Sequence, residues 1–86
     1  MDVIKVKAIS RTAAVAGAIA GVMREHDHAE VQAIGAGAVN QAVKAIILAK
    51  RYLDEEGISI GAIPEFVDVE IDGKIRTAIK LVIEPI

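Results

Sequence analysis

The 86-residue sequence predicts a two-layer α/β fold of the α+β kind, with a four-stranded mixed sheet and two helices on one face. The hydrophobic pattern alternates with a period of two near both ends of the chain, and it recurs at helical spacing in two Ala-rich segments between them. These segments follow one another in the order strand–helix–strand–helix–strand–strand. Because crossover connections are right-handed, this order places both helices on the same face of the sheet. We expect residues 1–86 to form one domain.

The first strand is expected over residues 3–9, where apolar and charged side chains alternate. Ile4 and Val6 lie on one face of this segment, and Lys5 and Lys7 lie on the other. This pattern is typical of a half-buried strand whose lysines point to solvent.

The first helix is expected from residue 13 to about residue 26, after Ser10 and Thr12, which offer side-chain oxygens for its N-cap. One face carries the aliphatic residues Val15, Ile19, Val22 and Met23. A second face carries the small residues Ala13, Gly17, Ala20 and Gly21. A glycine inside a helix costs about 1 kcal/mol relative to alanine, so we expect this second face to pack closely against the other helix.

A short strand over residues 30–34 runs into a Gly-X-Gly junction formed by Gly35 and Gly37, and a helix follows over residues 38–55. Glycines allow a tight turn and a close approach of another surface. The free N–H groups at the start of a helix also suit an anion such as phosphate, although the same sequence serves as ordinary turn chemistry. A dinucleotide-binding fingerprint would need a third glycine where Asn40 stands, and the Gly-Lys-Ser/Thr of a phosphate loop is absent.

The C-terminal part predicts a hairpin, with an extended segment over residues 58–71, interrupted at Pro64, and a last strand over residues 74–84. The two segments carry odd-numbered aliphatic residues, Val67, Val69 and Ile71 in the first and Ile75, Ile79, Leu81 and Ile83 in the second. If both sets face the core, the loop must hold an odd number of residues. We therefore expect a three-residue loop with Gly73 in the left-handed region. Asp68 and Glu70 would then lie opposite Lys74 and Arg76 on the outer face. The expected buried residues are Ile4, Val6, Val15, Ile19, Val22, Val43, Ile46, Val69, Ile79 and Leu81.

Composition argues against several classes of protein. Cysteine is absent, which excludes disulfides and thiolate metal sites. His26, Asp27 and His28 lack an evident third ligand, and no carboxylate pair sits in an apolar pattern. We therefore expect no metal, no cofactor, no small-molecule substrate and no enzymatic activity. The uncharged segments 12–23 and 31–43 are too short to span a membrane, so we expect a soluble, cytoplasmic protein.

Charge bears on nucleic-acid binding in two ways. The net charge of −2 argues against strong nonspecific binding, because a basic surface usually supplies that affinity. The basic residues nevertheless fall into groups: Arg11 before the first helix, Lys44, Lys50 and Arg51 on the second, and Lys74, Arg76 and Lys80 on the hairpin. Nearby carboxylates can pair with the hairpin group, and Asp54 and Glu55 can pair with Lys50 and Arg51. Arg11 has no acidic neighbour in the sequence, which makes it the best candidate contact.

Four strings of sequence resemble one known family. They are I-K-V-x-A at the start, V-A-G-A-I-A-G-V in the first helix, I-G-A-G-A-V-N-Q-A-V-K-A at the junction, and D-G-K-I-R-T-A-I-K-L-V-I-E-P at the end. Together they resemble the stage V sporulation protein S family, and the resemblance covers nearly the whole chain. That family is in turn similar to the Alba proteins, which are dimeric, chromatin-associated and bind DNA and RNA.

The resemblance implies an Alba-like fold and a regulatory protein that binds DNA or RNA phosphates without sequence specificity as a homodimer. By analogy with Alba it also implies an association with the nucleoid. The implied contacts, taken together with the residue patterns above, are Arg11, Thr12, Gly35, Gly37, Lys44, Lys74 and Arg76. The sequence departs from Alba at Ala36, where the junction has no basic side chain. An alternative is therefore a protein–protein adaptor in developmental regulation that kept the fold and lost nucleic-acid binding. The high apolar content, 53%, independently favours an oligomer, and we expect its interface on the second helix and the third strand.

Overall fold

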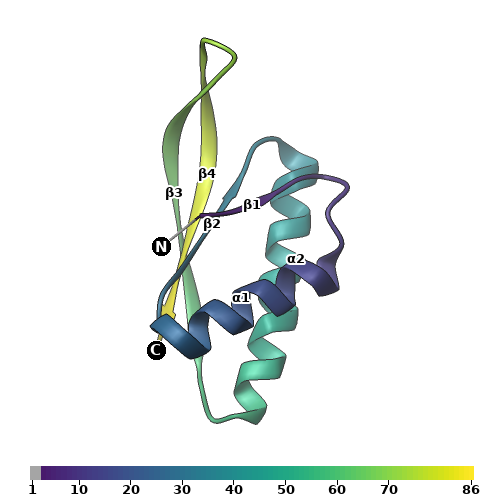
Figure 1. The fold of residues 1–86 in the computed structure, drawn as a ribbon, viewed down its shortest axis with the longest axis vertical. Helices are drawn as coiled ribbons and strands as arrows, with labels where there is room; N and C mark the ends of the chain where they lie inside the picture. The colour runs from purple at the N-terminus through teal and green to yellow at the C-terminus, as the bar shows by residue number, and fades with distance from the viewer. Residues whose placement is uncertain (1–2) are drawn as a thin grey trace.

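The computed structural model describes residues 3–86 and has the predicted order of helices and strands (Figure 1). The elements are β1 (Ile4–Val6), α1 (Thr12–His26), β2 (Ala29–Ala33), α2 (Ala36–Glu55), β3 (Ile60–Ile71) and β4 (Lys74–Pro85). β1 is shorter than expected, but its alternation is confirmed, because Val6 is buried while Lys5 and Lys7 are exposed.

The four strands form one mixed sheet in the order β1-β2-β4-β3, as the fold class requires. β1 and β2 are parallel, and the other two pairs are antiparallel. Both helices lie on the same side of the sheet (Figure 1). Along β2, the alternate residues Ala29, Val31 and Ala33 are buried on that side, as expected for a sheet covered on one face. Pro64 lies within β3, an edge strand, where its missing N–H is tolerated.

The buried face of α2 consists mainly of alanines, whereas the sequence pattern indicated larger aliphatic residues such as Val43 and Ile46. Its buried residues are Ala38, Ala42, Ala45, Ala49 and Leu53. The small alanine side chains let this helix approach α1 and the sheet closely. Val43, expected inside, is 43% exposed because it lies on the adjoining, uncovered face.

The other core expectations largely hold. Val6, Ile19 and Leu81 are buried. Ile4, Val15, Val22, Ile46 and Ile79 are partly buried and pack against the core.

The turn between β3 and β4 corrects the expected hairpin register. Ile71 pairs with Lys74, so the loop has two residues, Asp72 and Gly73, with φ angles of 52° and 77°. Two consecutive positive φ angles are those of a type I′ turn, which Asp-Gly favours. The hairpin tip extends beyond both helices (Figure 1), so no core burial opposes this preference. Odd-numbered residues of the two strands therefore lie on opposite faces, and Val69 is only half-buried, on the face away from the helices.

The expected close packing at the glycines of α1 is also wrong. A Cβ built at Gly17 or Gly21 would have no atom within 4 Å, and the buried small residues of α1 are Ala16 and Ala20. The close approach occurs instead at Gly37, where an added Cβ would lie 3.0 Å from the Cβ of Ala8.

Candidate functional site

Ion pairing divides the basic side chains into two classes. Of the ten lysines and arginines, three form ion pairs with carboxylates in the part of the chain that the structure describes: Arg24, Lys50 and Lys80. The other seven form no ion pair among residues 3–86: Lys5, Lys7, Arg11, Lys44, Arg51, Lys74 and Arg76. These seven define two clusters, one on the helices and one at the hairpin.

The first cluster, here called the helix groove, lies where the start of α1 meets α2. It is a shallow cavity of about 190 Å³ lined by Thr12, Lys44, Ile47, Leu48 and Arg51. Gln41 links α2 to the start of α1. Its Nε2 donates a hydrogen bond to the Ser10 carbonyl oxygen at 2.8 Å and contacts Thr12 Oγ1 at 3.4 Å. Arg11 occupies the N-cap position of α1, directly before Thr12.

The structure thus brings together Thr12 and Lys44, two of the residues named from the sequence, while Arg11 is not among the residues that line the groove. The expected N-cap hydrogen bond is absent among the described residues; Ser10 Oγ instead accepts from the Lys7 backbone N–H at 2.8 Å. Sequence reasoning missed Arg51 because Glu55 stands one turn away, yet no ion pair between them forms within residues 3–86. The spacing from Lys44, two helical turns, would have placed it on the same face.

The second cluster, here called the hairpin pocket, is a cavity of about 410 Å³ between β1, the start of α2 and the hairpin. Its basic side chains are Lys5, Lys7 and Arg76, and Ala38 of α2 lines it as well. Gly35 precedes α2 with a φ of 89°, which a glycine adopts without strain. Lys74 lies two residues before Arg76 on the same face of β4, nearer the hairpin tip.

The two-residue turn explains why Arg76 is free to line this cavity. Arg76 lies opposite Val69, and Lys74 lies opposite Ile71, so both face away from Asp68 and Glu70. The expected cross-strand ion pairs are therefore wrong. Asp68 instead accepts a hydrogen bond from Thr77 Oγ1 at 3.4 Å.

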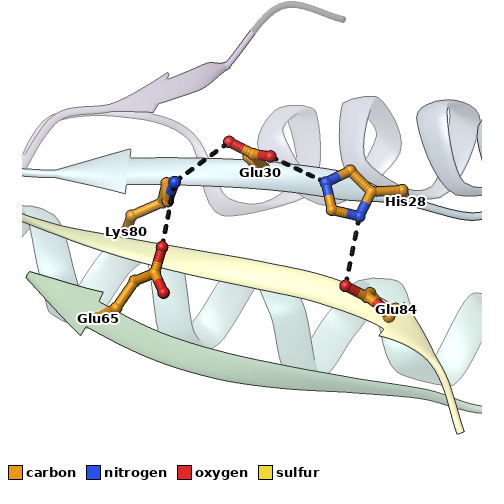
Figure 2. A network of polar contacts seen from close by, with 5 residues as sticks. All are labelled: His28, Glu30, Glu65, Lys80 and Glu84. Carbon is orange, nitrogen blue, oxygen red and sulfur yellow. Dashed lines mark hydrogen bonds and ion pairs between the residues drawn. The ribbon is translucent and has the colours of Figure 1, made fainter. Parts of the chain in front are cut away.

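Lys80 belongs to a separate network on the face of the sheet away from the helices (Figure 2). His28 Nε2 lies 2.8 Å from Glu30 Oε2, and His28 Nδ1 lies 3.5 Å from Glu84 Oε1. Lys80 Nζ bridges Glu30 at 3.6 Å and Glu65 at 3.1 Å. The hydrogen bond with His28, aided by the charge of Lys80, lowers the pKa of Glu30, and the hydrogen bond with Glu65 raises the pKa of Lys80. The Lys80 charge is thus neutralised internally.

No three His, Cys, Asp or Glu side chains among residues 3–86 are arranged to hold a metal ion. Likewise, within those residues no helix is long and apolar enough to cross a membrane.

The fold and these clusters define a small two-layer α+β protein with cationic surface sites. Comparison with known families is consistent with that class: residues 2–86 match the model described as Stage V sporulation protein S. The chain belongs to this family, as the sequence resemblance predicted, and is thus a sporulation-related protein.

Proposed function

We propose that this protein is a developmental regulator that binds DNA or RNA through phosphate contacts, without strong sequence preference, as a homodimer. The observation that carries the proposal is the set of basic side chains that form no ion pair among residues 3–86. Five of these seven line the two cavities: Lys44 and Arg51 line the helix groove, and Lys5, Lys7 and Arg76 line the hairpin pocket. Five carboxylates lie at the C-terminal ends of the helices, whereas Asp68, Glu70 and Asp72 lie in the hairpin. A net charge of −2 is therefore compatible with locally cationic surfaces.

The proposed contacts are Arg11, Thr12, Gly35, Gly37, Lys44, Lys74 and Arg76. Side-chain contacts to phosphate position a protein on nucleic acid but carry no base information. Two protomers would supply about 4–6 phosphate contacts, which corresponds to a salt slope of roughly −4 to −5 on duplex DNA and weak, around micromolar, affinity.

The dimer is proposed on α2 and β3 because both present apolar side chains to solvent. Val43 on α2 is 43% exposed, and Phe66 on β3 is 78% exposed. Phe66 also lines a shallow apolar cavity with Pro64 and Ile79. A second protomer would cover these side chains and the free edge of β3.

Fluorescence anisotropy with labelled DNA duplexes of two unrelated sequences and with RNA, at salt concentrations from about 50 to 200 mM, tests the binding. Arg11→Glu should weaken binding to every sequence alike. Lys50→Glu is the matched control: it changes net charge equally, but Lys50 is paired with Asp54 at 3.0 Å and should matter little. Failure of DNA and RNA to bind at the lowest salt, or an Arg11→Glu variant that binds normally, would favour the adaptor.

Sedimentation at micromolar concentration tests the dimer separately. Phe66→Asp should produce monomers, because a charge would be buried in the proposed interface. Ile9→Asp is the control, since Ile9 is 90% exposed in the loop after β1, away from that interface. A wild-type protein that sediments as a monomer would refute this part of the proposal.

A further inference from the structure

We propose that the hairpin pocket is a phosphate-binding site for one nucleotide unit, in which Lys5, Lys7 and Arg76 are the ligands. For a phosphate within a nucleic-acid strand, the inference rests on the proposed function. It adds Lys5 and Lys7 to the proposed contacts, whereas the sequence pattern placed these two lysines only on the solvent-facing side of β1. The phosphate could also come from a free nucleoside monophosphate, whose chemistry is the same.

The three cations come from distant parts of the chain and converge because of strand register. Lys5 pairs across β1–β2 with Gln32, and Gln32 pairs across β2–β4 with Lys80. Arg76 lies four residues before Lys80 on β4 and therefore shares its face. Lys5, Gln32 and Arg76 thus meet on the face of the sheet away from the helices, and all three line the pocket.

Lys7 is held in place by the loop that follows β1. Its backbone N–H donates to Ser10 Oγ at 2.8 Å, and its carbonyl oxygen accepts from the Ser10 N–H at 3.0 Å. The next residue, Ala8, rests against Gly37, where even a methyl group would come within 3.0 Å of its Cβ. The loop is therefore fixed against the start of α2, so the backbone of Lys7 is already ordered and only its side chain must be ordered when a ligand binds.

Charge balance distinguishes this pocket from an ordinary solvated sheet surface. On the same face, Lys80 is neutralised by two carboxylates, Glu30 and Glu65. Lys5, Lys7 and Arg76 form no ion pair within the described residues, and the pocket lining includes one carboxylate, that of Glu70. Three cations against one anion leave an excess of positive charge, which an entering phosphate would balance.

The size and walls of the pocket indicate the class of ligand. A volume of about 410 Å³ falls in the range of small-molecule sites and suits a phosphate with its sugar. The apolar residues of the lining are all aliphatic, and neither aromatic residue of the chain, Tyr52 or Phe66, lines the pocket. Without an aromatic ring to stack on a base, we expect recognition of the phosphate with little discrimination between bases.

The test is a titration of the ¹⁵N-labelled full-length chain, followed by NMR, with AMP, inorganic phosphate and an oligodeoxythymidylate of about 12 nucleotides. Amide shifts should concentrate at residues 5–8, 32–38 and 69–76. The variant Lys7→Gln with Arg76→Gln should bind at least about tenfold more weakly, because it loses two charge-assisted hydrogen bonds. Lys50→Gln with Lys80→Gln is the control: it removes the same net charge from paired side chains and should bind normally.

Each outcome separates the pocket from the proposed function. Binding of AMP that the pocket variant loses supports the site, even if long DNA and RNA fail to bind. Binding of the oligonucleotide alone, weakened in the pocket variant, also supports it and identifies the strand backbone as the source of phosphate. Nucleic-acid binding that is unchanged in the pocket variant overturns the inference and leaves the proposed function standing. Absence of binding by all probes overturns both.

Discussion

Replacing Gly17 and Gly21 by alanine should stabilise this protein, although both glycines lie in the middle of a helix that packs on α2. The structure leaves open space at both positions, because an added Cβ would have no atom within 4 Å. Alanine then gains its helix propensity without a steric cost. The main gain arises in the unfolded chain, which loses conformational freedom when glycine is replaced.

The expected size follows from these open positions. Each substitution should contribute about 0.5–1 kcal/mol, and the two should add, giving about 1–2 kcal/mol in the double variant. For a domain of this size, each kcal/mol raises Tm by about 4–8 °C. Circular dichroism during heating and urea titration measures both quantities, at several protein concentrations so that any oligomer is taken into account.

Gly37→Ala is the matched control of opposite sign. It lies within α2, yet its new Cβ would stand 3.0 Å from the Cβ of Ala8, and neither atom can move independently of its backbone. This variant should be destabilised while the α1 variants are stabilised. A lower Tm for Gly17→Ala or Gly21→Ala would refute the reasoning, because it would mean that this face of α1 is packed against another surface in solution.

Three further predictions concern the core, the turn and the acid limb of stability. Leu53→Ala should cost about 2–5 kcal/mol in urea unfolding, because Leu53 is fully buried; a cost below about 1 kcal/mol would contradict its place in the core. Gly73→Val should cost about 1–2 kcal/mol because its φ is 77°, whereas Asp72→Asn should be nearly neutral; equal effects would argue against the type I′ turn. The pKa of Glu30 is lowered from 4.5 in the folded state, so its contribution is present above that pH and is lost as pH falls through the folded value. Glu30→Gln should thus be less stable than wild type at neutral pH, and the difference should shrink in acid; a constant difference between pH 7 and pH 3 would contradict this linkage.

The sequence alone determined the order of the elements, the sheet class and the family. The alternation in β1 and the helical spacing in the Ala-rich segments follow from local backbone geometry, so each pattern is visible within its own segment of the sequence. The expected boundaries were less accurate, since α2 begins at Ala36 and β1 ends at Val6. Element ends depend on hydrogen bonds with residues far away in the sequence, such as the bond that the Ser10 carbonyl oxygen accepts from Gln41, and local patterns do not contain these bonds.

Which face of α2 is buried was decided by tertiary structure. Valines and isoleucines indicated one stripe, but the alanine stripe from Ala38 to Ala49 is the one inside. Small side chains fit into the space between α2 and its neighbours in the core, and the width of that space is set only when the helices pack on the sheet. Similarly, the buried small residues of α1 are Ala16 and Ala20, and of the small face predicted from the sequence only Ala20 is among them, while Gly17 and Gly21 face open space.

In the candidate site, too, the sequence determined some features and the tertiary structure determined the others. Arg11, Lys44 and Arg76 could be named from the sequence as basic residues, and the lack of an acidic neighbour indicated that Arg11 is unpaired, but the sequence predicted ion pairs for Arg76 that do not form in the described part of the chain. A core face shared by both strands would require a hairpin loop with an odd number of residues. The hairpin tip lies beyond the helices, however, so the preference of Asp72 and Gly73 for a type I′ turn decided the register. That register turned Arg76 away from the acidic residues of β3 and toward β1. Ion pairing depends on which side chains become neighbours in space, and only the assembled sheet brings the two ends of the chain together.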